Sequence, residues 1–369
     1  MKVLITGSNG FIGKNLIARI KEKPSINVVK FSREDTEEDL AKLVNDVDLV
    51  IHLAGVNRPE HDDLFLKDNL KLTTSLCDLL KSKGNKVPII FSSSTQATLD
   101  NPYGKSKLMS EEVINRYSTE TNSIAYIYRL PNVFGKWSKP SYNSVVSTFC
   151  HNVINGKKLE VHNLNTELNL VYIDDLVDEF ISIIDQKKSI DSGPQYPVYQ
   201  IHLSDLANLI KSFKLSRNNI TIEKVGVGLV RALYATYLSF LSPENFSYEL
   251  QVHSDERGKF GEFLKTKDSG QISYFTIKPG FTRGEHYHHT KNEKFLLVKG
   301  SAKFRFRNIL NNEIFIKSVT EKYAEVIESI PGWVHDVTNT GKDEAIIMLW
   351  ANEIFNEALP DTYFTRIES

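Results

Sequence analysis

Hydrophobic positions divide this chain into two parts with different periodicities. Up to residue 241, short apolar runs of the kind that form strands alternate with longer segments whose apolar residues recur at helical spacing. From Ser247 onward the helical spacing stops, and short strand-like runs follow one another between Gly, Asp, Asn and Pro residues. The pattern therefore predicts two domains, residues 1–243 and residues 244–369.

The first part has the order of elements that is typical of α/β proteins. Strands that alternate with helices usually pair in parallel, so we expect a doubly wound parallel sheet. The second and third predicted strands lie so close in sequence that no further strand and helix fit between them, which makes the sheet compact. An aspartate of the pair Asp174–Asp175 is expected to cap the helix after the last strand. The predicted strands are 3–6, 28–31, 49–55, 87–91 and 124–130, and residues 171–177 are predicted to be a last strand that leads into a helix.

The second part predicts an all-β domain. Many short strands at even spacing favour a closed barrel or a jelly roll, because these architectures leave few unpaired strand edges. The predicted strands are 271–277, 293–298, 301–306, 313–319, 323–330 and 345–349.

Composition narrows the class of protein without naming a function. A chain of 369 residues is long enough for two domains, and a net charge of −1 gives no support to a nucleic-acid partner. Cys77 and Cys150 are too few for a disulfide framework, which favours the cytoplasm. The most apolar run, residues 226–241, is shorter than the ~20 residues that span a bilayer, so we expect no membrane contact.

A glycine turn directly follows the first predicted strand. Gly7, Gly10 and Gly13 have the spacing G-x-x-G-x-x-G, and the segment after them has helical character. Such glycines permit a tight turn, a close approach of a pyrophosphate and close packing of helix on strand. The sequence thus predicts a Rossmann-type dinucleotide site. The residues at this turn are Gly7, Ser8, Asn9, Gly10, Phe11, Ile12 and Gly13.

Arg33, just beyond the second predicted strand, bears on the choice of cofactor. An NAD site usually places an acidic residue at this strand end, whereas an arginine matches the 2′-phosphate of NADPH. We therefore expect NADPH, although Glu34 and Asp35 follow at once and leave NADH open.

Two further segments carry groups for acid–base chemistry. Tyr103 and Lys107 are four residues apart, so they share one face of a predicted helix. An ammonium beside a phenol favours the phenolate, which suits a general acid and base. The run Ser92–Thr95, at the end of a predicted strand, offers hydroxyl donors for a substrate oxygen. Asn69, on a predicted helix, is either a cofactor contact or a satisfied buried amide.

These motifs resemble those of the extended short-chain dehydrogenase/reductase family over residues 1–240. The resemblance implies that Tyr103 donates the proton, that Lys107 activates it and binds the ribose, and that Ser94 or Thr95 holds the carbonyl, with Ser94 favoured. The family mostly acts on nucleotide sugars, and the compact sheet resembles its sugar-ketone reductases. The resemblance also implies cofactor contacts at Leu53, Ala54 and Gly55 and a substrate contact at Asn132.

Histidines mark the second domain. In a regular strand, His286 and His288 point to the same face. With Glu293 and His335 they offer three imidazoles and a carboxylate, which suits a divalent cation, zinc above all. The spacings G-x5-H-x-H-x4-E-x6-G and P-x3-H resemble the two signature motifs of the cupin family. A histidine-rich surface loop without metal is the alternative.

A finer likeness is to the nucleotide-diphospho-4-keto-sugar epimerases within the cupins. It rests on residues 255–262 and 283–287, and it implies that Arg257 and Arg283 hold the diphosphate. It also makes His286 a catalytic base, which competes with the role of metal ligand. The histidine and glutamate set favours the ligand role, so the base stays unassigned.

The two resemblances together imply a bifunctional enzyme of capsule-precursor synthesis. The cupin would epimerise C3 of a nucleotide-linked 4-keto hexose, and the first domain would then reduce the C4 ketone. In one alternative the cupin is only a metal-stabilised structural or dimerisation module. In others the chain is a ligand sensor, or the cupin interconverts aldose and ketose. Cupins of this kind commonly pair, so a homodimer is expected.

Overall fold

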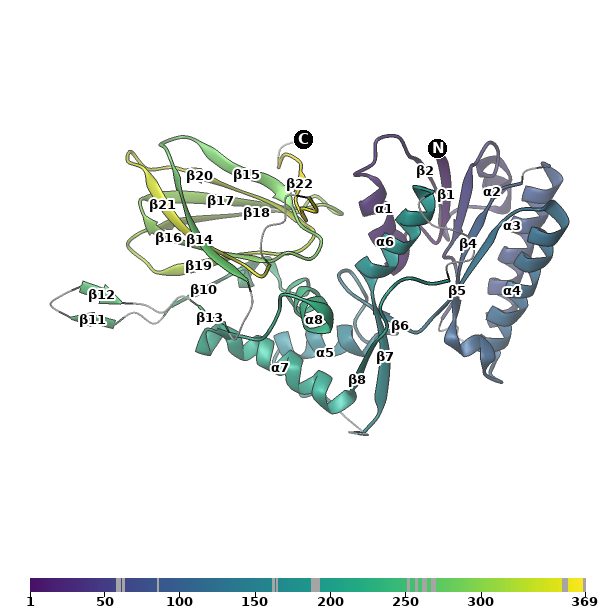
Figure 1. The fold of residues 1–369 in the computed structure, drawn as a ribbon, viewed down its shortest axis with the longest axis horizontal. Helices are drawn as coiled ribbons and strands as arrows, with labels where there is room; N and C mark the ends of the chain where they lie inside the picture. Colours follow the sequence, from purple (N-terminus) through teal and green to yellow (C-terminus); the bar gives the residue numbers. More distant parts are fainter. Residues whose placement is uncertain are drawn as a thin grey trace. The chain divides into compact units, whose positions relative to one another are not determined.

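The structure is a computed structural model of residues 1–369. It describes residues 1–57, 61, 64–84, 86–160, 163, 165–186, 193–250, 253–255, 258–260, 264–266, 270–353 and 358–367. The chain forms two compact units (Figure 1). The first comprises Met1–Val133 and Asn169–Tyr199, and the second Phe134–Leu168 and Gln200–Ser369. Segments 134–168 and 200–243 are thus in the second unit, and a domain boundary at residue 243 remains a prediction.

The first unit contains the predicted α/β elements. They are β1 (Lys2–Thr6), α1 (Phe11–Ile20), β2 (Asn27–Phe31), α2 (Glu37–Leu43), β3 (Leu49–His52), η1 (Phe65–Leu70), α3 (Lys71–Ser82), β4 (Ile89–Ser94), η2 (Thr95–Thr98), α4 (Pro102–Thr121), β5 (Ala125–Leu130) and α6 (Ile173–Ile184).

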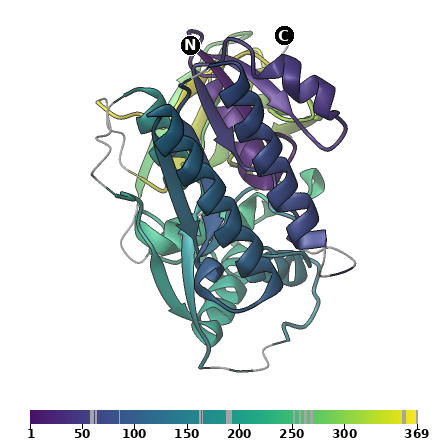
Figure 2. The same ribbon diagram turned by 90° about the vertical axis from the view of Figure 1, so that its right-hand side faces the viewer.

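The central sheet has the order β2-β1-β3-β4-β5, and all its pairs are parallel. The chain leaves β1 toward β2 and then crosses back to β3, so β1 and β3 flank the topological switch point where such sheets bind ligands. Helices α1 and α6 cover one face, and α2, α3 and α4 cover the other (Figure 1). Figure 2 shows α3 and α4 side by side in front of the sheet. The prediction of a compact parallel sheet is confirmed.

The sequence of α4 explains where this helix begins and ends. Asn101 caps it by accepting a hydrogen bond from the Gly104 N–H at 2.8 Å, and Pro102 occupies the first helical position. Asn122 ends it in the left-handed conformation, with a φ of 54°. On its inner face, Ile114 packs into the apolar core beneath the sheet.

Two local predictions in this unit were wrong. Helix α6 is capped by Tyr172 without a side-chain hydrogen bond, and Asp174 lies in its first turn. The chain passes from strand to helix with no loop residue between them, so no aspartate reaches the cap position. Strand β3 ends at His52, and residues 53–55 leave the sheet as a separate segment.

Three strands contain the positions at which the two units divide. They form a separate sheet of order β6-β7-β8. Their bounds are Asn132–Phe134 for β6, Glu167–Tyr172 for β7 and Tyr199–His202 for β8.

In the part of the second unit that the structure describes, helices are combined with the predicted all-β region. Its elements are α5 (Val145–Ile154), α7 (Leu203–Asn219), β9 (Thr221–Ile222), α8 (Gly228–Leu238), η4 (Pro243–Asn245), β10 (Ser247–Glu249), β11 (His253–Asp255), β12 (Gly258–Phe260), β13 (Lys265–Thr266), β14 (Gln271–Ile277), β15 (Thr282–Tyr287), β16 (Glu293–Lys299), β17 (Ser301–Asn308), β18 (Ile314–Thr320), β19 (Glu325–Ser329), β20 (Trp333–Asn339), β21 (Ala345–Ala351) and β22 (Tyr363–Phe364).

Two five-stranded antiparallel sheets form the all-β region, with the orders β10-β19-β16-β21-β14 and β18-β17-β20-β15-β22. Aromatic residues from both sheets meet in the interior, where Phe295 of β16 contacts Phe304 of β17. This is the double-sheet arrangement of a jelly roll. Beside it, α5, α7 and α8 pack on one another through rings such as Phe213 and Tyr234, 5.1 Å apart.

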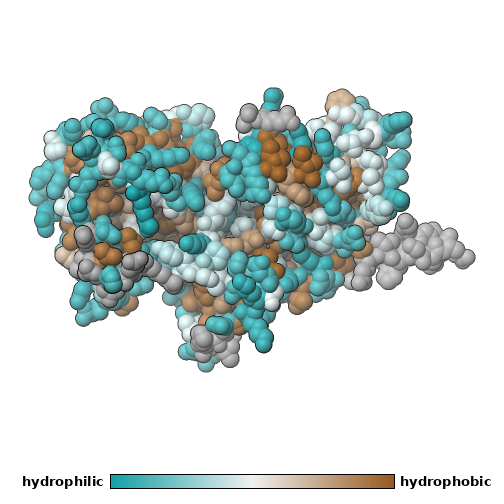
Figure 3. Space-filling model, turned by 180° about the vertical axis from the view of Figure 1, so that it is seen from behind, coloured by the Kyte–Doolittle hydropathy of each residue, from teal (hydrophilic) through white to brown (hydrophobic). Residues whose placement is uncertain are grey.

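Hydrophilic side chains predominate on the face shown in Figure 3, and hydrophobic ones lie in separate groups. None of the helices that the structure describes combines the length and apolar character needed to cross a membrane. Cys77 and Cys150 are both buried and free, in agreement with the prediction that no disulfide framework exists.

Candidate functional site

The glycine turn of the first unit has the close packing that its sequence predicts. Gly7 has a φ of +68°, and a Cβ there would lie 2.7 Å from the backbone nitrogen of Ala54. At Gly13, a Cβ would lie 2.4 Å from the Gly7 carbonyl oxygen. Residues 53–55 therefore run directly beside the turn, as the predicted cofactor contacts require.

The N-terminus of α1, the helix that follows the glycine turn, is available to bind an anion. Gly10 caps α1 without a side-chain hydrogen bond, and the first turn of α1 contains no acidic residue. Phosphate groups bind at such helix N-termini because backbone N–H groups and the helix dipole both favour negative charge. These residues fit the pyrophosphate of a dinucleotide.

The end of β2 lies at the same edge of the parallel sheet as the glycine turn. The Ser8 N–H donates to the Phe31 carbonyl at 3.2 Å, which brings the glycine turn next to Ser32 and Arg33. The Asp35 carboxylate accepts hydrogen bonds from the backbone and the hydroxyl of Ser32, at 2.6 and 3.0 Å. Asp35 is thus engaged in its own turn, and the exposed Arg33 side chain is available at the strand end.

Tyr103 is placed by the glycine that follows it. A Cβ on Gly104 would lie 2.2 Å from the Gln96 carbonyl oxygen and 2.7 Å from that of Leu99. Helix α4 therefore packs without a gap against η2, which continues directly from Ser94. Tyr103 therefore lies in the first turn of a helix that packs against the residues directly after the serine strand end.

Lys107 lies buried one helical turn beyond Tyr103. Its Nζ is 5.9 Å from the centroid of the Tyr103 ring and donates a hydrogen bond to the Ser92 carbonyl at 2.8 Å. A Cβ on Gly55 would lie 3.4 Å from this Nζ. Burial lowers the pKa of Lys107 to about 8, and the carboxylate of Glu111 opposes that shift.

The four hydroxyl residues have different surroundings. The Ser92 hydroxyl donates to the His52 carbonyl at 3.4 Å, and the Ser93 hydroxyl donates to Glu111. The Ser94 oxygen accepts a hydrogen bond from the Gln96 N–H at 3.2 Å. Thr95 is exposed and lines a hollow of about 460 Å³ in the first unit. The hollow is lined by Thr95, Arg129, Pro131, Asn169, Pro194, Tyr196 and Val198.

Glu111 is a residue of this site that sequence reasoning missed. It is 5% exposed, accepts the Ser93 hydroxyl and forms a two-pronged ion pair with Arg129, with the shortest distance 2.6 Å. Its position four residues after Lys107 was the signal that could have identified it.

Asn69 is a satisfied buried amide, one of its two expected roles. It accepts from the Val56 N–H at 2.7 Å and donates to the Val56 carbonyl and the Ser106 hydroxyl. Asn69 thus braces the segment after β3 against α4.

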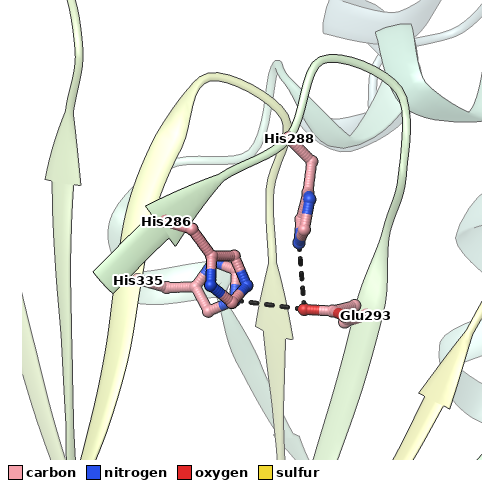
Figure 4. A group of neighbouring side chains, drawn as sticks. All are labelled: His286, His288, Glu293 and His335. Carbon is pink, nitrogen blue, oxygen red and sulfur yellow. Dashed lines mark hydrogen bonds and ion pairs between the residues drawn. The ribbon is translucent and has the colours of Figure 1, made fainter. Parts of the chain in front are cut away.

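The four predicted metal ligands meet between the two sheets of the second unit (Figure 4). His286 comes from β15, His335 from β20 and Glu293 from β16. Each residue offers one ligand atom, and these atoms all lie within 4.8 Å of one another. Bonds of about 2.0–2.2 Å to one zinc ion would hold such atoms roughly 3–4 Å apart. The four ligand atoms therefore need to move only slightly closer together to bind one ion.

His288 does not continue the strand, contrary to prediction. Strand β15 ends at Tyr287, and a register shift between Gly284 and His286 bends it just before. His288 instead follows in the turn and reaches the cluster from above in Figure 4. Its Nε2 and that of His335 each lie 3.1 Å from the Glu293 Oε2.

Burial and charge in the cluster favour neutral imidazoles at His286 and His335 and an ionised carboxylate at Glu293. Burial lowers the pKa of His286 to about 3 and also lowers that of His335. Burial by itself would raise the pKa of Glu293, but His288 and His335 hold it well below its ordinary value. The buried Nδ1 of His286 has no hydrogen-bond partner. Neutral imidazoles around an ionised carboxylate are the form that binds a cation.

Tyr287 and Asp336, which are next to cluster residues in the sequence, make structural contacts of their own. Tyr287 points into an apolar group with Val334 and Ile367. Asp336, next to His335 in sequence, is fully buried and paired with Arg305 at 2.6 Å.

The predicted substrate residues are only partly described. Arg283 is exposed on β15, with its guanidinium 5.9 Å from the Phe275 ring centroid, and Asn132 is exposed on β6. Arg257 lies outside the described residues.

The parallel sheet with its glycine turn and tyrosine–lysine helix defines a class of nucleotide-dependent enzymes. The chain belongs to the NAD dependent epimerase/dehydratase family, whose model matches residues 3–199. Residues 253–363 match the polysaccharide biosynthesis C-terminal domain.

Similar proteins extend this assignment over both units. The UDP-2-acetamido-2,6-beta-L-arabino-hexul-4-ose reductase of Pseudomonas aeruginosa is 50% identical over 364 residues, covering 98% of each chain. The crystal structure of the capsular polysaccharide assembling protein CapF from Staphylococcus aureus superposes with a TM-score of 0.69 at 42% identity, and it covers 99% of this chain and 100% of that chain.

A structure of CapF with the inhibitor 3-isopropenyl-tropolone is 37% identical, with a TM-score of 0.63 and the same coverage. The predicted fold class, an α/β Rossmann-type sheet followed by an all-β cupin domain, is thereby confirmed.

Proposed function

We propose that this chain is a bifunctional nucleotide-sugar enzyme of capsular polysaccharide synthesis. Its substrate is a UDP-2-acetamido-2,6-dideoxy-4-keto-hexose. The cupin domain epimerises C3, and the first domain then reduces the C4 ketone with NADPH. The product is of the 2-acetamido-2,6-dideoxy-L-talose type, on the route to N-acetyl-L-fucosamine. The proposal is carried by the presence, on one chain, of the Tyr103–Lys107 pair and the histidine–glutamate cluster.

In the reductive step, NADPH supplies a hydride when bound. Tyr103 gives the phenol proton to the C4 oxygen of the sugar, and Ser94 donates a hydrogen bond to the same oxygen. Lys107 places a positive charge beside the phenol and favours its ionised form after the transfer. Arg33 binds the 2′-phosphate of the cofactor, and Asn132 contacts the sugar.

In the epimerisation step, the C4 carbonyl acidifies the C3 hydrogen, so that a base can remove it. Reprotonation from the other face inverts C3. His286, His288, Glu293 and His335 would hold a divalent cation, which would supply Lewis acidity toward the carbonyl oxygen. Arg283 binds the diphosphate. The residue that acts as base is not assigned.

The chemistry of the inhibitor in one CapF structure is compatible with the proposed metal. A tropolone carries a carbonyl and a hydroxyl oxygen on adjacent carbons, an arrangement that chelates divalent cations. Zinc fits the nitrogen and carboxylate donors of this chain better than magnesium or calcium, which prefer oxygen ligands.

A structural role for the cupin is the second candidate function. The four candidate ligands would fill a tetrahedral zinc site, and structural metal sites are closed by protein ligands in this way. In this version the metal stabilises the jelly roll, the cupin joins two chains in a homodimer, and only the reductase is active. Light scattering of the purified protein measures the oligomeric state directly.

One experiment separates these functions. The protein is incubated with UDP- and dTDP-linked 4-keto-6-deoxy sugars in deuterium oxide, with and without NADPH, and the products are analysed by NMR and mass spectrometry. Bifunctional activity gives deuterium at C3 without NADPH and a reduced, inverted sugar with it. Reduction without any C3 deuterium would leave the cupin a structural role. Movement of the carbonyl within the sugar would indicate an isomerase, and cofactor binding without turnover would indicate a sensor.

A further inference from the structure

One carboxylate from far along the chain holds the turn that carries His288. The Asp361 carboxylate accepts hydrogen bonds from the backbone N–H groups of His289, Thr290 and Lys291, at 2.9, 2.7 and 2.7 Å. It also accepts the Thr290 hydroxyl at 2.9 Å. Consecutive N–H groups that converge in this way form an anion site, and here a side chain of the same protein fills it.

Asp361 also contacts a predicted metal ligand directly. Its backbone carbonyl is hydrogen-bonded to Nδ1 of His288. Because a carbonyl only accepts, Nδ1 must carry the proton. The other nitrogen, Nε2, lies 3.1 Å from the Glu293 Oε2. In the neutral imidazole, which is the form that binds a metal, Nε2 then carries the lone pair and faces this carboxylate oxygen, so that both atoms can bind one cation.

The same turn also positions Glu293, the carboxylate ligand of the cluster. Lys291, whose backbone is bonded to Asp361, has its Nζ 3.3 Å from the Glu293 Oε1 and 3.3 Å from the Thr362 hydroxyl. The ammonium thus occupies one oxygen of Glu293 and leaves Oε2 facing the histidines. This arrangement favours a carboxylate that binds a cation through a single oxygen.

The segment around Asp361 is itself anchored beside the cluster. Strand β22 pairs with β15, so that Phe364 lies opposite His286. The Thr365 N–H donates to the Glu285 carbonyl at 2.8 Å. Residues 361–365 therefore flank His286 on one side and His288 on the other.

We propose that Asp361 is a positioning residue of the metal centre. It sets the tautomer of His288 through its carbonyl, and it sets the turn that aims Lys291 at Glu293 through its carboxylate. Partners of this kind orient metal ligands without touching the ion, and their loss typically weakens metal affinity about 10–100-fold. Because Asp361 acts only if the cluster binds a metal, this role rests on the proposed function.

The test measures zinc affinity of the full chain by competition with a chromophoric chelator. It compares the wild type with Asp361→Asn, Asp361→Ala and a control, Asp343→Asn, whose side chain is exposed in the same unit. We expect about a 10–100-fold loss of affinity in both Asp361 variants and none in the control. Cobalt(II) in place of zinc reports the ligand set through its visible spectrum, which we expect to change only in the Asp361 variants.

Melting of the metal-free proteins separates positioning from simple stabilisation. Folded Asp361→Asn protein with unchanged zinc affinity and cobalt spectrum would overturn the proposal, even if its melting temperature falls. The amide keeps the size of the side chain and one acceptor oxygen, so this variant carries the test if Asp361→Ala does not fold. Wild-type protein that takes up neither zinc nor cobalt would instead overturn the metal site itself.

Discussion

Lys107 is a buried cation whose charge depends on Glu111, four residues further along α4. Burial lowers the pKa of Lys107 to about 8, while the Glu111 carboxylate acts in the opposite direction. The ammonium is therefore present below that pH and is lost as the pH rises through it. Since the proposed reduction needs this ammonium, we expect kcat/KM for the ketone to fall on the alkaline side near pH 8.

Replacement of Glu111 by Gln tests this dependence. The variant removes the charge that supports the ammonium, so the pKa of Lys107 falls further and the alkaline limb of the pH–rate profile moves to lower pH. The neighbouring Glu112→Gln, an exposed position on the same helix, is the control and should leave the limb in place. An unshifted limb in Glu111→Gln protein would contradict the role of Lys107.

Tyr103→Phe tests the proton donor. Without the phenol, we expect NADPH-dependent reduction to fall by about 10²–10⁴-fold, the range that general acid catalysis contributes. Deuterium exchange at C3 should persist, because it belongs to the other domain. Tyr323→Phe, at an exposed turn, is the control. Loss of both activities in Tyr103→Phe protein would break the two-site proposal.

Single residues show what sequence reasoning can and cannot find. Tyr103 and Lys107 could be paired from their spacing on one helix. Gly7 and the four members of the histidine–glutamate cluster were identified through their motifs instead, since the cluster draws on three strands and a turn. Asp361 was not predictable, since its partners lie 70 to 73 residues away and no local pattern connects them.

At the scale of elements, the glycine turn offers a matched pair of substitutions. Gly7 and Gly84 both have a φ of +68°. A Cβ at Gly7 would lie 2.7 Å from the backbone nitrogen of Ala54, whereas a Cβ at Gly84 would have no atom within 4 Å. Both alanine variants carry the strain of a left-handed residue, about 1–2 kcal/mol. Only Gly7→Ala also pushes β1 away from residues 53–55.

We therefore expect Gly7→Ala to lose NADPH binding and Gly84→Ala to keep it with a modest fall in stability. Fluorescence titration with NADPH and thermal melting measure the two effects. Equal NADPH affinity in both variants would mean that the turn is not the cofactor site.

Strands and helices were predictable wherever periodicity alone determines them. Strand β14 has the predicted bounds, 271–277, and the compact five-stranded sheet followed from the short interval between its second and third strands. Predictions at element ends were less accurate. The helix cap at Tyr172 and the end of β15 before His288 depend on how the chain turns between sheets, which the hydrophobic pattern does not encode.

For the whole molecule, the proposed function joins two chemistries on one chain. Epimerisation alone leaves a mixture, whereas reduction of the ketone removes the acidity of C3 and retains the new configuration. Covalent linkage raises the local concentration of the intermediate at the second site.

Loss of the metal should separate the two activities. His335→Ala removes a ligand, so we expect zinc content and C3 deuterium exchange to fall together. Reduction of a ketone that is already inverted at C3 should continue. His202→Ala, at an exposed position of the same unit, is the control. Retained exchange in zinc-free His335→Ala protein would assign the cupin metal a structural role.

The bond between Asp361 and the His288 turn also sets an order of assembly. The two positions are 73 residues apart, and a ribosome adds about 5–20 residues per second, so Asp361 is made roughly 4–15 seconds after His288. During that interval His288 has been made, but nothing yet secures its turn. On the proposed role of Asp361, metal capture would be a late event of biosynthesis, at full affinity only after the residues around 361 have emerged and paired with β15.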